Sequence, residues 1–448
     1  MPLCAQDATS LNDSLRVTKI TIIGNKKTRP QIILRELSFK VGTNQSKMKL
    51  RNDVEWSRQQ LINTSLFVDA KITPILSDST VEMTIELKER WYFFPLIYFR
   101  LVDRNFNQWW VDQNKSLERV NYGIKFTQNN VTGRKDNLDV WLIAGYTQQV
   151  NLRYDLPYID KKLKSGINVG IGYLTQKEVN FATGNNKQLF FNKEEQFLRK
   201  QFRADFTYTY RPAYSQRHSF RISYNDETVS DSVLVLTPNY YANNQTRFKY
   251  VDFNYKFKYY HADINFYPTN GFMFEGNIYK RGLWGESNLW MFNARAVYAI
   301  PLAKNSFLHF EGTAQWKFPD KAAFTDQRLL GYGSFQMRGL EYNVVDGLKG
   351  VMLRSTVHQK LLGFEIKNPI KSKTHDRIPV RIYIKAFTDL GYANIKNQAP
   401  SNTLNNKFLY TYGFGIDIVS IYDFVFKIEY SFNQLGVDGL YLHSRNDF

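Results

Sequence analysis

The sequence predicts a mainly β protein, in which one small β-α-α-β-β domain precedes a 16-stranded antiparallel transmembrane β-barrel. Aromatic residues make up 16% of the 448 residues, whereas hydrophobic residues in total reach only 43%. The longest apolar run, Trp91 to Phe99, contains Pro95 and is far shorter than the roughly 20 residues of a membrane-spanning helix. From residue 91 onward apolar and polar residues alternate, as in strands that face lipid on one side and a polar lumen on the other.

Residues 1–14 are expected to be the remnant of an export signal or a disordered N-terminus. Ala5 is a candidate cleavage residue. Cys4 is an alternative lipidation site, but Leu3 stands where a small residue is expected, so a cysteine removed with the signal is the favoured interpretation. The chain has one cysteine, which excludes a disulfide framework and a multi-cysteine metal site.

Residues 15–90 are predicted to form the small domain. The expected elements are a strand over 16–23 that ends at the Gly24-Asn25 turn, a helix capped by Thr28 with Pro30 in its first turn, a helix over 53–62, and strands over 68–72 and 81–87. This order is β-α-α-β-β. No flexible linker separates residue 90 from the next segment, so the domain should lie close to the barrel mouth.

Residues 91–448 are assigned to the barrel. Val251, Phe253 and Tyr255, for example, alternate with Asp252 and Asn254. A sandwich also alternates, but here many interleaved residues are charged while the apolar face is continuously aromatic, which favours a barrel in lipid. About 16 such segments fit the span, and the longest connections are expected near 178–199, 226–246, 318–347 and 391–406.

Several short motifs carry a resemblance to a known family. They are LRYDLPYID at 152–160 with Asp155, Pro157 and Tyr158, YPTNG at 267–271 with Pro268 and Gly271, GYGSFQMRGLEY at 331–342 with Arg338 and Gly339, FTDLG at 387–391 with Asp389 and Gly391, GFGI at 413–416, and the terminal Phe448. Together with residues 16–90, which look like a POTRA domain, they resemble the BamA / two-partner-secretion transporter superfamily. The chain is similar to that family with one POTRA-like domain, although Leu156 interrupts the usual Asp-Pro-Tyr turn.

The resemblance implies a bacterial outer-membrane protein that inserts β-barrel clients or translocates proteins, with its POTRA domain in the periplasm. Unfolded outer-membrane or secreted clients would add strands to the POTRA sheet edge. Membrane lipid and lipopolysaccharide are further expected partners, and accessory lipoproteins are an additional candidate. The alternatives are an outer-membrane transport channel or receptor and, less favoured, a barrel-borne hydrolase.

The resemblance also implies a lid loop, about 318–347, that folds into the lumen and carries Arg338 and Gly339. Its arginine would pair with Asp389 on the barrel wall. Alternation supports this, because Ile384 and Ala386 face outward and Asp389 therefore faces inward. An ordinary surface Arg-Gly turn is the alternative.

The expected second acid is missing from the strand after the lid loop. Its inward positions are Met352, Arg354, Thr356, His358 and Lys360. Glu429 is the candidate substitute for this acid. The ion-pair network of the family is therefore expected here in altered form.

The last strand, about 440–448, is short and weakly apolar. It is expected to pair poorly with the first strand near 94–102, which would leave a boundary able to open sideways. Simple fraying of the chain end is the alternative.

No catalytic motif, metal-ligand spacing or phosphate-binding loop is present in the sequence. The protein is therefore expected to be no enzyme and to need no cofactor or metal. His358 and Asp389, both expected in the lumen, are the candidate groups of the hydrolase alternative. The net charge of +18 is spread along the chain without a basic block, so no nucleic-acid partner is expected.

Overall fold

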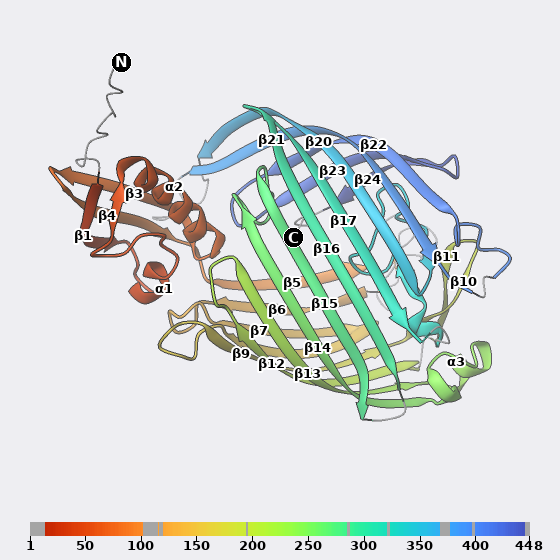
Figure 1. Cartoon of the computed structure of the whole chain (residues 1–448). Coiled ribbons are helices and arrows are strands. Elements are labelled where there is room, and N and C mark those ends of the chain that lie inside the picture. Colours follow the sequence, from red (N-terminus) through yellow and green to blue (C-terminus); the bar gives the residue numbers. More distant parts are fainter. Residues whose placement is uncertain are drawn as a thin grey trace, which may run out of the picture.

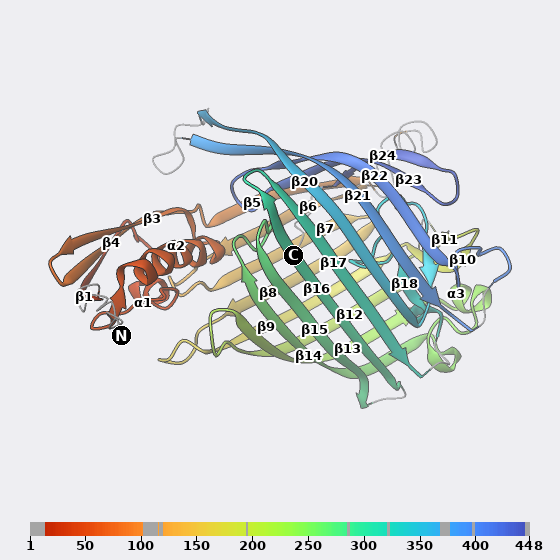
Figure 2. The same ribbon diagram turned by 45° about the horizontal axis from the view of Figure 1, so that its top comes forward.

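The computed structural model describes residues 14–101, 115, 120–193, 196–284, 287–319, 323–367, 377–396 and 399–443. The expectations for Cys4, Ala5 and Phe448 lie outside these residues. A small domain is docked at one end of a large barrel (Figures 1 and 2). No helix within the described ranges has both the length and the apolar character to cross a membrane.

The small domain is a four-stranded sheet, in the order β2-β1-β4-β3, packed against two helices. Its elements are β1 (Ser14–Ile23), α1 (Pro30–Leu34), β2 (Asn44–Ser46), α2 (Lys47–Asn63), β3 (Phe67–Ser77) and β4 (Thr80–Glu89). Ile33 of α1 and Leu61 of α2 are fully buried in one cluster with Val17, Phe67 and Ile85 of the sheet. The apolar residues that alternate along the strands therefore build a separate core for this domain.

Three details of this domain differ from the sequence prediction. The order is β-α-β-α-β-β, because the three residues of β2 pair with β1 and are too few to show an alternating pattern. Thr28 does not cap α1; Arg29 holds that position without a side-chain hydrogen bond. The backbone N–H of Thr28 instead donates to the Glu89 carboxylate at 2.7 Å. Helix α2 is also longer than expected, since Ser46 caps it and accepts a hydrogen bond from the Lys49 backbone.

The barrel is a single 16-stranded antiparallel sheet, which confirms the predicted fold class. Its strands are β5 (Phe93–Leu101), β6 (Val120–Asn129), β7 (Asn137–Gly145), β8 (Thr147–Leu156), β9 (Ser165–Gln176), β12 (Arg199–Tyr210), β13 (Gln216–Val229), β14 (Arg247–Ala262), β15 (Gly271–Trp284), β16 (Leu289–Ala303), β17 (Ser306–Phe318), β20 (Lys349–Lys367), β21 (Arg377–Asn394), β22 (Phe408–Val419), β23 (Val425–Asn433) and β24 (Asp438–His443).

Side chains on the barrel follow the expected alternation. Phe206 is half exposed on the outside, whereas its neighbour Asp205 is buried on the inside. On β21, Ile384 faces outward and the adjacent Lys385 is buried. The outer face is thus apolar and the inner face polar, as lipid outside and a polar lumen inside require.

The far end of the barrel carries longer connections than the end near the small domain (Figure 2). The connection predicted near 178–199 contains a hairpin of β10 (Glu178–Gly184) and β11 (Lys187–Asn192), and that near 226–246 contains α3 (Asp231–Leu236) and a 3₁₀ turn (Ala242–Asn244). The connection between β17 and β20 contains a 3₁₀ turn (Phe324–Asp326) and the strands β18 (Arg328–Leu330) and β19 (Val345–Asp346). We call this connection the lid loop.

The first and last barrel strands, β5 and β24, do not pair with each other within the described residues, and the ladder runs only from β24 around to β5. Beside the small domain, β5 nevertheless contacts the turn that precedes β23, the neighbour of β24. There Phe94 of β5 contacts Tyr422 of the β22–β23 turn, with ring centroids 5.8 Å apart. We call the boundary between β5 and β24 the seam. Residues 444–448 of the expected last strand lie outside the described residues, so weak pairing with the first strand stays a prediction.

The small domain contacts barrel turns that are far apart in the sequence. The Arg90 guanidinium pairs with Asp423 of the β22–β23 turn at 2.9 Å. On α2, the Asn63 amide donates to the Asp263 carbonyl in the β14–β15 turn at 3.3 Å. The Arg29 backbone N–H donates to the Gly133 carbonyl in the β6–β7 turn at 3.0 Å. These contacts place the domain across the barrel mouth.

Candidate functional site

The lid loop folds into the barrel and is held by an apolar cluster. This cluster joins Leu329, Leu330, Phe335, Met337, Leu340 and Val345 of the loop to Met352, Ala393, Leu404 and Leu409. Burying these side chains offsets the conformational entropy that a connection of this length loses on ordering. The loop thereby acquires a defined position, from which Arg338 reaches the barrel wall.

Arg338 binds Asp389 of β21 through its backbone and its side chain. The backbone N–H donates to Oδ2 at 3.0 Å, Nε donates to both carboxylate oxygens at 3.0 and 3.1 Å, and Nη2 also contacts Oδ1. Nη1 donates to Thr356 Oγ1 at 3.0 Å, and the guanidinium lies 3.9 Å from the centre of the Phe387 ring. Asp389 is fully buried, so this arrangement supplies the partner that a buried carboxylate requires.

Two glycines allow the lid loop to approach the wall closely. Gly339 has φ +81°, and a Cβ there would lie 3.1 Å from the Ser431 Cβ. Its carbonyl accepts a hydrogen bond from the Asn433 amide at 2.7 Å. At Gly391 a Cβ would lie 2.6 Å from the Met337 sulfur. A larger side chain at Gly339 would be strained by the positive φ and would press on Ser431. At Gly391 a larger side chain would force the Met337 side chain to move.

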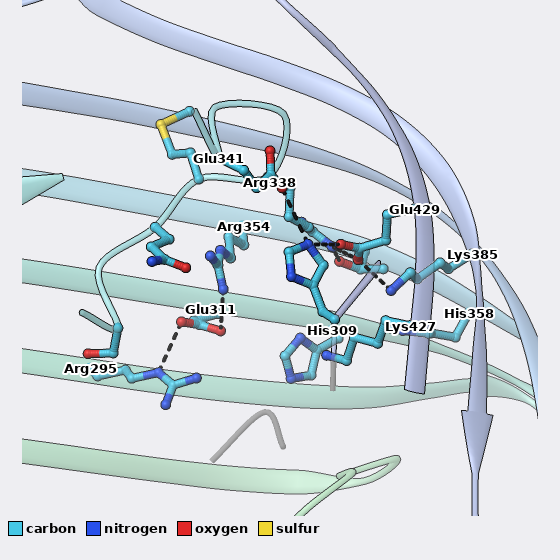
Figure 3. Close-up of a pocket in the computed structure, with 15 residues that line it drawn as sticks. Arg295, His309, Glu311, Arg338, Glu341, Arg354, His358, Lys385, Lys427 and Glu429 are labelled. Atoms are coloured by element: carbon cyan, nitrogen blue, oxygen red, sulfur yellow. Dashed lines mark hydrogen bonds and ion pairs between the residues drawn. The ribbon is translucent and has the colours of Figure 1, made fainter. Parts of the chain in front are cut away.

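Arg354 lies on β20, the strand on which the resemblance implies an acid. It lies between two carboxylates, with Nε 3.6 Å from Asp389 Oδ2 and Nη1 3.7 Å from Glu311 Oε2. Arg295 then donates to Glu311 Oε1 at 3.0 Å. Figure 3 shows Glu311 between Arg354 and Arg295. The acid on β17 thus balances the additional arginine on β20.

A second cluster lies on β21, β22 and β23. The buried Lys385 ammonium is 2.5 Å from Asp417 Oδ1 and 2.6 Å from Glu429 Oε1. Glu429 also lies 4.0 Å from Arg338 Nη1, which connects the two clusters. The Tyr267 hydroxyl, from the YPTNG motif, donates to Asp417 Oδ2 at 3.0 Å. The lumen therefore contains one continuous network of alternating charges.

The histidine of the hydrolase alternative belongs to this network. His358 Nε2 faces Asp417 Oδ2 at 3.4 Å, and its ring stacks on Phe307 with a centroid distance of 4.4 Å. Asp389 is engaged by Arg338 instead. His358 and Asp389 therefore do not form a pair in the described part of the chain.

The other motif residues lie in turns or strands next to the small domain. Asp155 is on β8 opposite Asn168 of β9, and Pro157 follows in the β8–β9 turn. Pro268 is buried in the β14–β15 turn. Gly271 has φ +121°, and a Cβ there would lie 2.2 Å from the His261 carbonyl oxygen. These residues shape the docking end of the barrel and lie outside the lumen network.

Tyr158 takes part in a buried contact between the small domain and the barrel. The Arg211 guanidinium binds the Glu36 carboxylate at 2.5 and 2.7 Å and donates to the Tyr158 hydroxyl at 3.0 Å. Arg35 lies over the Tyr158 ring at 4.9 Å. Burial acts to raise the pKa of Glu36, but the charges and hydrogen bonds of Arg211 outweigh it and, with Arg35, lower the pKa from 4.5 to about 2.

The sequence does not predict the roles of Arg295, Glu311, Asp417, Glu36 and Arg211 in these contacts. Alternation along the strand predicts that Lys385 faces the lumen, and the same reasoning could have predicted the burial of Asp417. Their pairing depends on the register between β21 and β22, in which Lys385 lies opposite Gly415. Glu36 and Arg211 are 175 positions apart and carry no motif.

Comparison with known proteins adds two findings. The POTRA family model, "Surface antigen variable number repeat", matches residues 15–90. Among solved structures, the chain is similar to CdiB from Escherichia coli, with a TM-score of 0.57, 12% identity, and coverage of 96% of this chain and 74% of that one. It is also similar to BamA from Haemophilus ducreyi lacking POTRA domains 1–3, with a TM-score of 0.52, 15% identity, and coverage of 96% and 83%. The comparison with curated proteins found no match.

Proposed function

Because residues 15–90 form a POTRA domain and the following barrel has the fold of BamA and CdiB, we propose that this protein inserts β-barrel clients into the bacterial outer membrane. The proposal rests on the absence of pairing at the seam among the described residues. β5 and β24 do not pair within the described residues, so each presents backbone hydrogen-bonding groups to an incoming strand. The POTRA domain would lie in the periplasm and receive clients, and no enzymatic step is required.

The occupied lumen favours insertion over translocation through the barrel. The lid loop is held by the apolar cluster around Met337 and by the charge network around Arg338. Passage of a chain through the lumen would have to break both sets of contacts, whereas entry at the seam breaks neither. Translocation of a secreted protein is the second candidate, since CdiB has the same fold.

An edge of the POTRA sheet offers a docking place for clients. β3 is an edge strand that carries Pro74, a residue confined to edge strands within sheets. Ile75 and Leu76 on this strand are more than half exposed. An extended client could add to this edge by β-augmentation. Contacts with lipopolysaccharide and accessory lipoproteins stay predictions.

Depletion of the protein, followed by quantitative proteomics of the outer membrane and the culture medium, tests this proposal. An insertase predicts loss of one or more barrel proteins from the outer membrane. Loss of a secreted protein from the medium, with all barrels intact, would support translocation instead. Unchanged proteomes together with steady ion conductance of the purified barrel would indicate a channel.

A further inference from the structure

Three potential metal ligands converge where the lid loop meets the last strand. Glu341 lies on the lid loop, three residues after Arg338, while Glu429 lies on β23 and His443 ends β24. Tyr441 on β24 is buried and Leu442 is exposed, so His443 points inward on the same face as Tyr441. The nearest ligand atoms of the three side chains all lie within 4.8 Å of one another. Figure 3 shows Glu341 and Glu429 at this wall of the lumen.

The distances fit the edges of a metal coordination sphere. His443 Nε2 is 3.4 Å from Glu341 Oε1 and 3.3 Å from Glu429 Oε2. Zinc binds imidazole nitrogen and carboxylate oxygen at about 2.0–2.2 Å, so two ligands of a tetrahedral site lie about 3.4 Å apart. The two His443 contacts match this spacing, and the Glu341 and Glu429 oxygens lie within 4.8 Å of each other, so side-chain adjustment would bring all three atoms to bonding distance of one ion.

Glu341 requires a partner that the described residues do not fully provide. Both of its carboxylate oxygens are buried, and none of the described residues donates a hydrogen bond to them. His443 Nε2 is buried as well, and its contacts with the two carboxylates do not have hydrogen-bond geometry. An ionised carboxylate in such a place is costly unless it is paired or coordinates a metal.

Glu429 can serve both the charge network and this cluster. Its Oε1 faces Lys385 at 2.6 Å and Arg338 at 4.0 Å, while its Oε2 faces His443. The carboxylate thus has one oxygen for the cations of the wall and one for the cluster. Lys427 lies opposite His443 in the β23–β24 ladder and lines the same cavity of about 150 Å³, so its charge opposes a cation there. Because Glu429 already faces Lys385 and Arg338, the Glu341 carboxylate is the group that counters this charge.

We propose that Glu341, Glu429 and His443 bind one divalent transition-metal ion, with Zn²⁺ as the best match to an imidazole and two carboxylates. Three protein ligands leave a fourth position for water on the cavity side. The ion would join the lid loop to β23 and β24 and hold the last strand beside the seam. This metal binding does not depend on the proposed insertase function.

The test uses the full chain refolded in detergent and stripped of metal with a chelator. Zn²⁺ is titrated by calorimetry, and Co²⁺ is added as a spectroscopic probe, because a coordinated Co²⁺ shows visible absorption bands that an ion pair cannot produce. We expect one site per chain in the wild type. Glu341→Gln and His443→Ala should each weaken binding by at least about 100-fold, since even second-shell substitutions cost 10–100-fold in affinity.

Matched controls separate this site from adventitious binding and from misfolding. His218→Ala removes a histidine of β13 that hydrogen-bonds Tyr255 and should bind the metal like the wild type. Electrophoretic mobility of unheated samples reports whether each variant has a folded barrel. Hydrogen exchange in 438–443 should slow when Zn²⁺ is added to the wild type but not to Glu341→Gln. Absence of saturable binding in the wild type, or wild-type affinity in either Glu341→Gln or His443→Ala, would overturn the proposal.

Discussion

Replacing Arg338 with alanine leaves the buried carboxylate of Asp389 without its main partner. The variant loses the hydrogen bonds of the guanidinium to Asp389 and Thr356 and its contact with the Phe387 ring. Breaking a buried ion pair by removing one member costs about 3–5 kcal/mol. Arg354 lies 3.6 Å from Asp389 and offsets part of the loss. We therefore expect the free energy of unfolding to fall by about 3 kcal/mol, the lower end of that range.

Urea unfolding of the barrel in detergent, followed by tryptophan fluorescence, measures this change. Arg377→Ala is the matched control, because Arg377 is 72% exposed and pairs with Glu365 at 3.1 Å. A surface pair contributes about 0–1 kcal/mol, so this variant should unfold nearly like the wild type. Combining Arg338→Ala with Asp389→Asn should cost less than the sum of the two single changes, because the carboxylate that needs a partner is then absent.

The same variants connect stability to activity. If the lid loop must stay bound to the wall, Arg338→Ala should also insert clients more slowly in a reconstituted assay. The reasoning would be refuted if the Arg338→Ala barrel folds, keeps full activity and loses less than about 1 kcal/mol of its free energy of unfolding. Such a small loss is what an exposed ion pair contributes, so the Arg338–Asp389 pair would then behave like a surface pair.

Three further predictions concern the docking contact, the close approach of the lid loop and the seam. The low pKa of Glu36 makes its pairing with Arg211 contribute stability that is present above pH 4.5 and is lost as the pH falls toward about 2. A pKa lowered from 4.5 to about 2 corresponds to roughly 3 kcal/mol. Acid unfolding monitored by hydrogen exchange in the small domain should therefore show a shallower loss of stability for Glu36→Gln than for the wild type. Gly339 has φ +81° and lies against Ser431, so Gly339→Ala should lower the free energy of unfolding, measured in urea, by about 1–2 kcal/mol. Gly312→Ala is the control and should lower it less, because nothing lies within 4 Å of a Cβ there. Amide exchange should be faster in 93–101 of β5 than in 271–284 of β15, which pairs on both sides, and equal protection would contradict an unpaired seam.

The alternating pattern of the strands was sufficient to predict the barrel and its inward residues. Asp389 lies inside because Ile384 and Ala386 must face outward, and the structure places it there. The sequence also predicts a domain boundary near residue 90, after which the alternation with a period of two continues, and the POTRA family model matches residues 15–90. Such features are local, since each strand's pattern can be read without knowing its neighbours.

The detailed partners of the lumen could not be read in this way. Alternation along each strand shows that Lys385 and Glu429 point inward. Their contact, however, depends on the register across three strands and on the curvature of the barrel. Thr28 was mistaken for a helix cap because its buried bond to Glu89 joins residues 61 positions apart. Contacts between residues so far apart in the chain cannot be predicted from local helix or strand propensity.

The sequence by itself determined the strand periodicity, the two-domain organisation and the positions of Arg338 and Asp389 on a loop and an inward strand face. Only the tertiary structure decided that Glu429 lies 4.0 Å from Arg338 and that Arg354 lies between Asp389 and Glu311. It also decided that Glu36 meets Arg211 across the domain boundary and that Glu341, Glu429 and His443 converge. The physical reason is that alternation is set by the backbone of a single strand, whereas charge pairing depends on distances of a few ångströms between strands and loops remote in the chain.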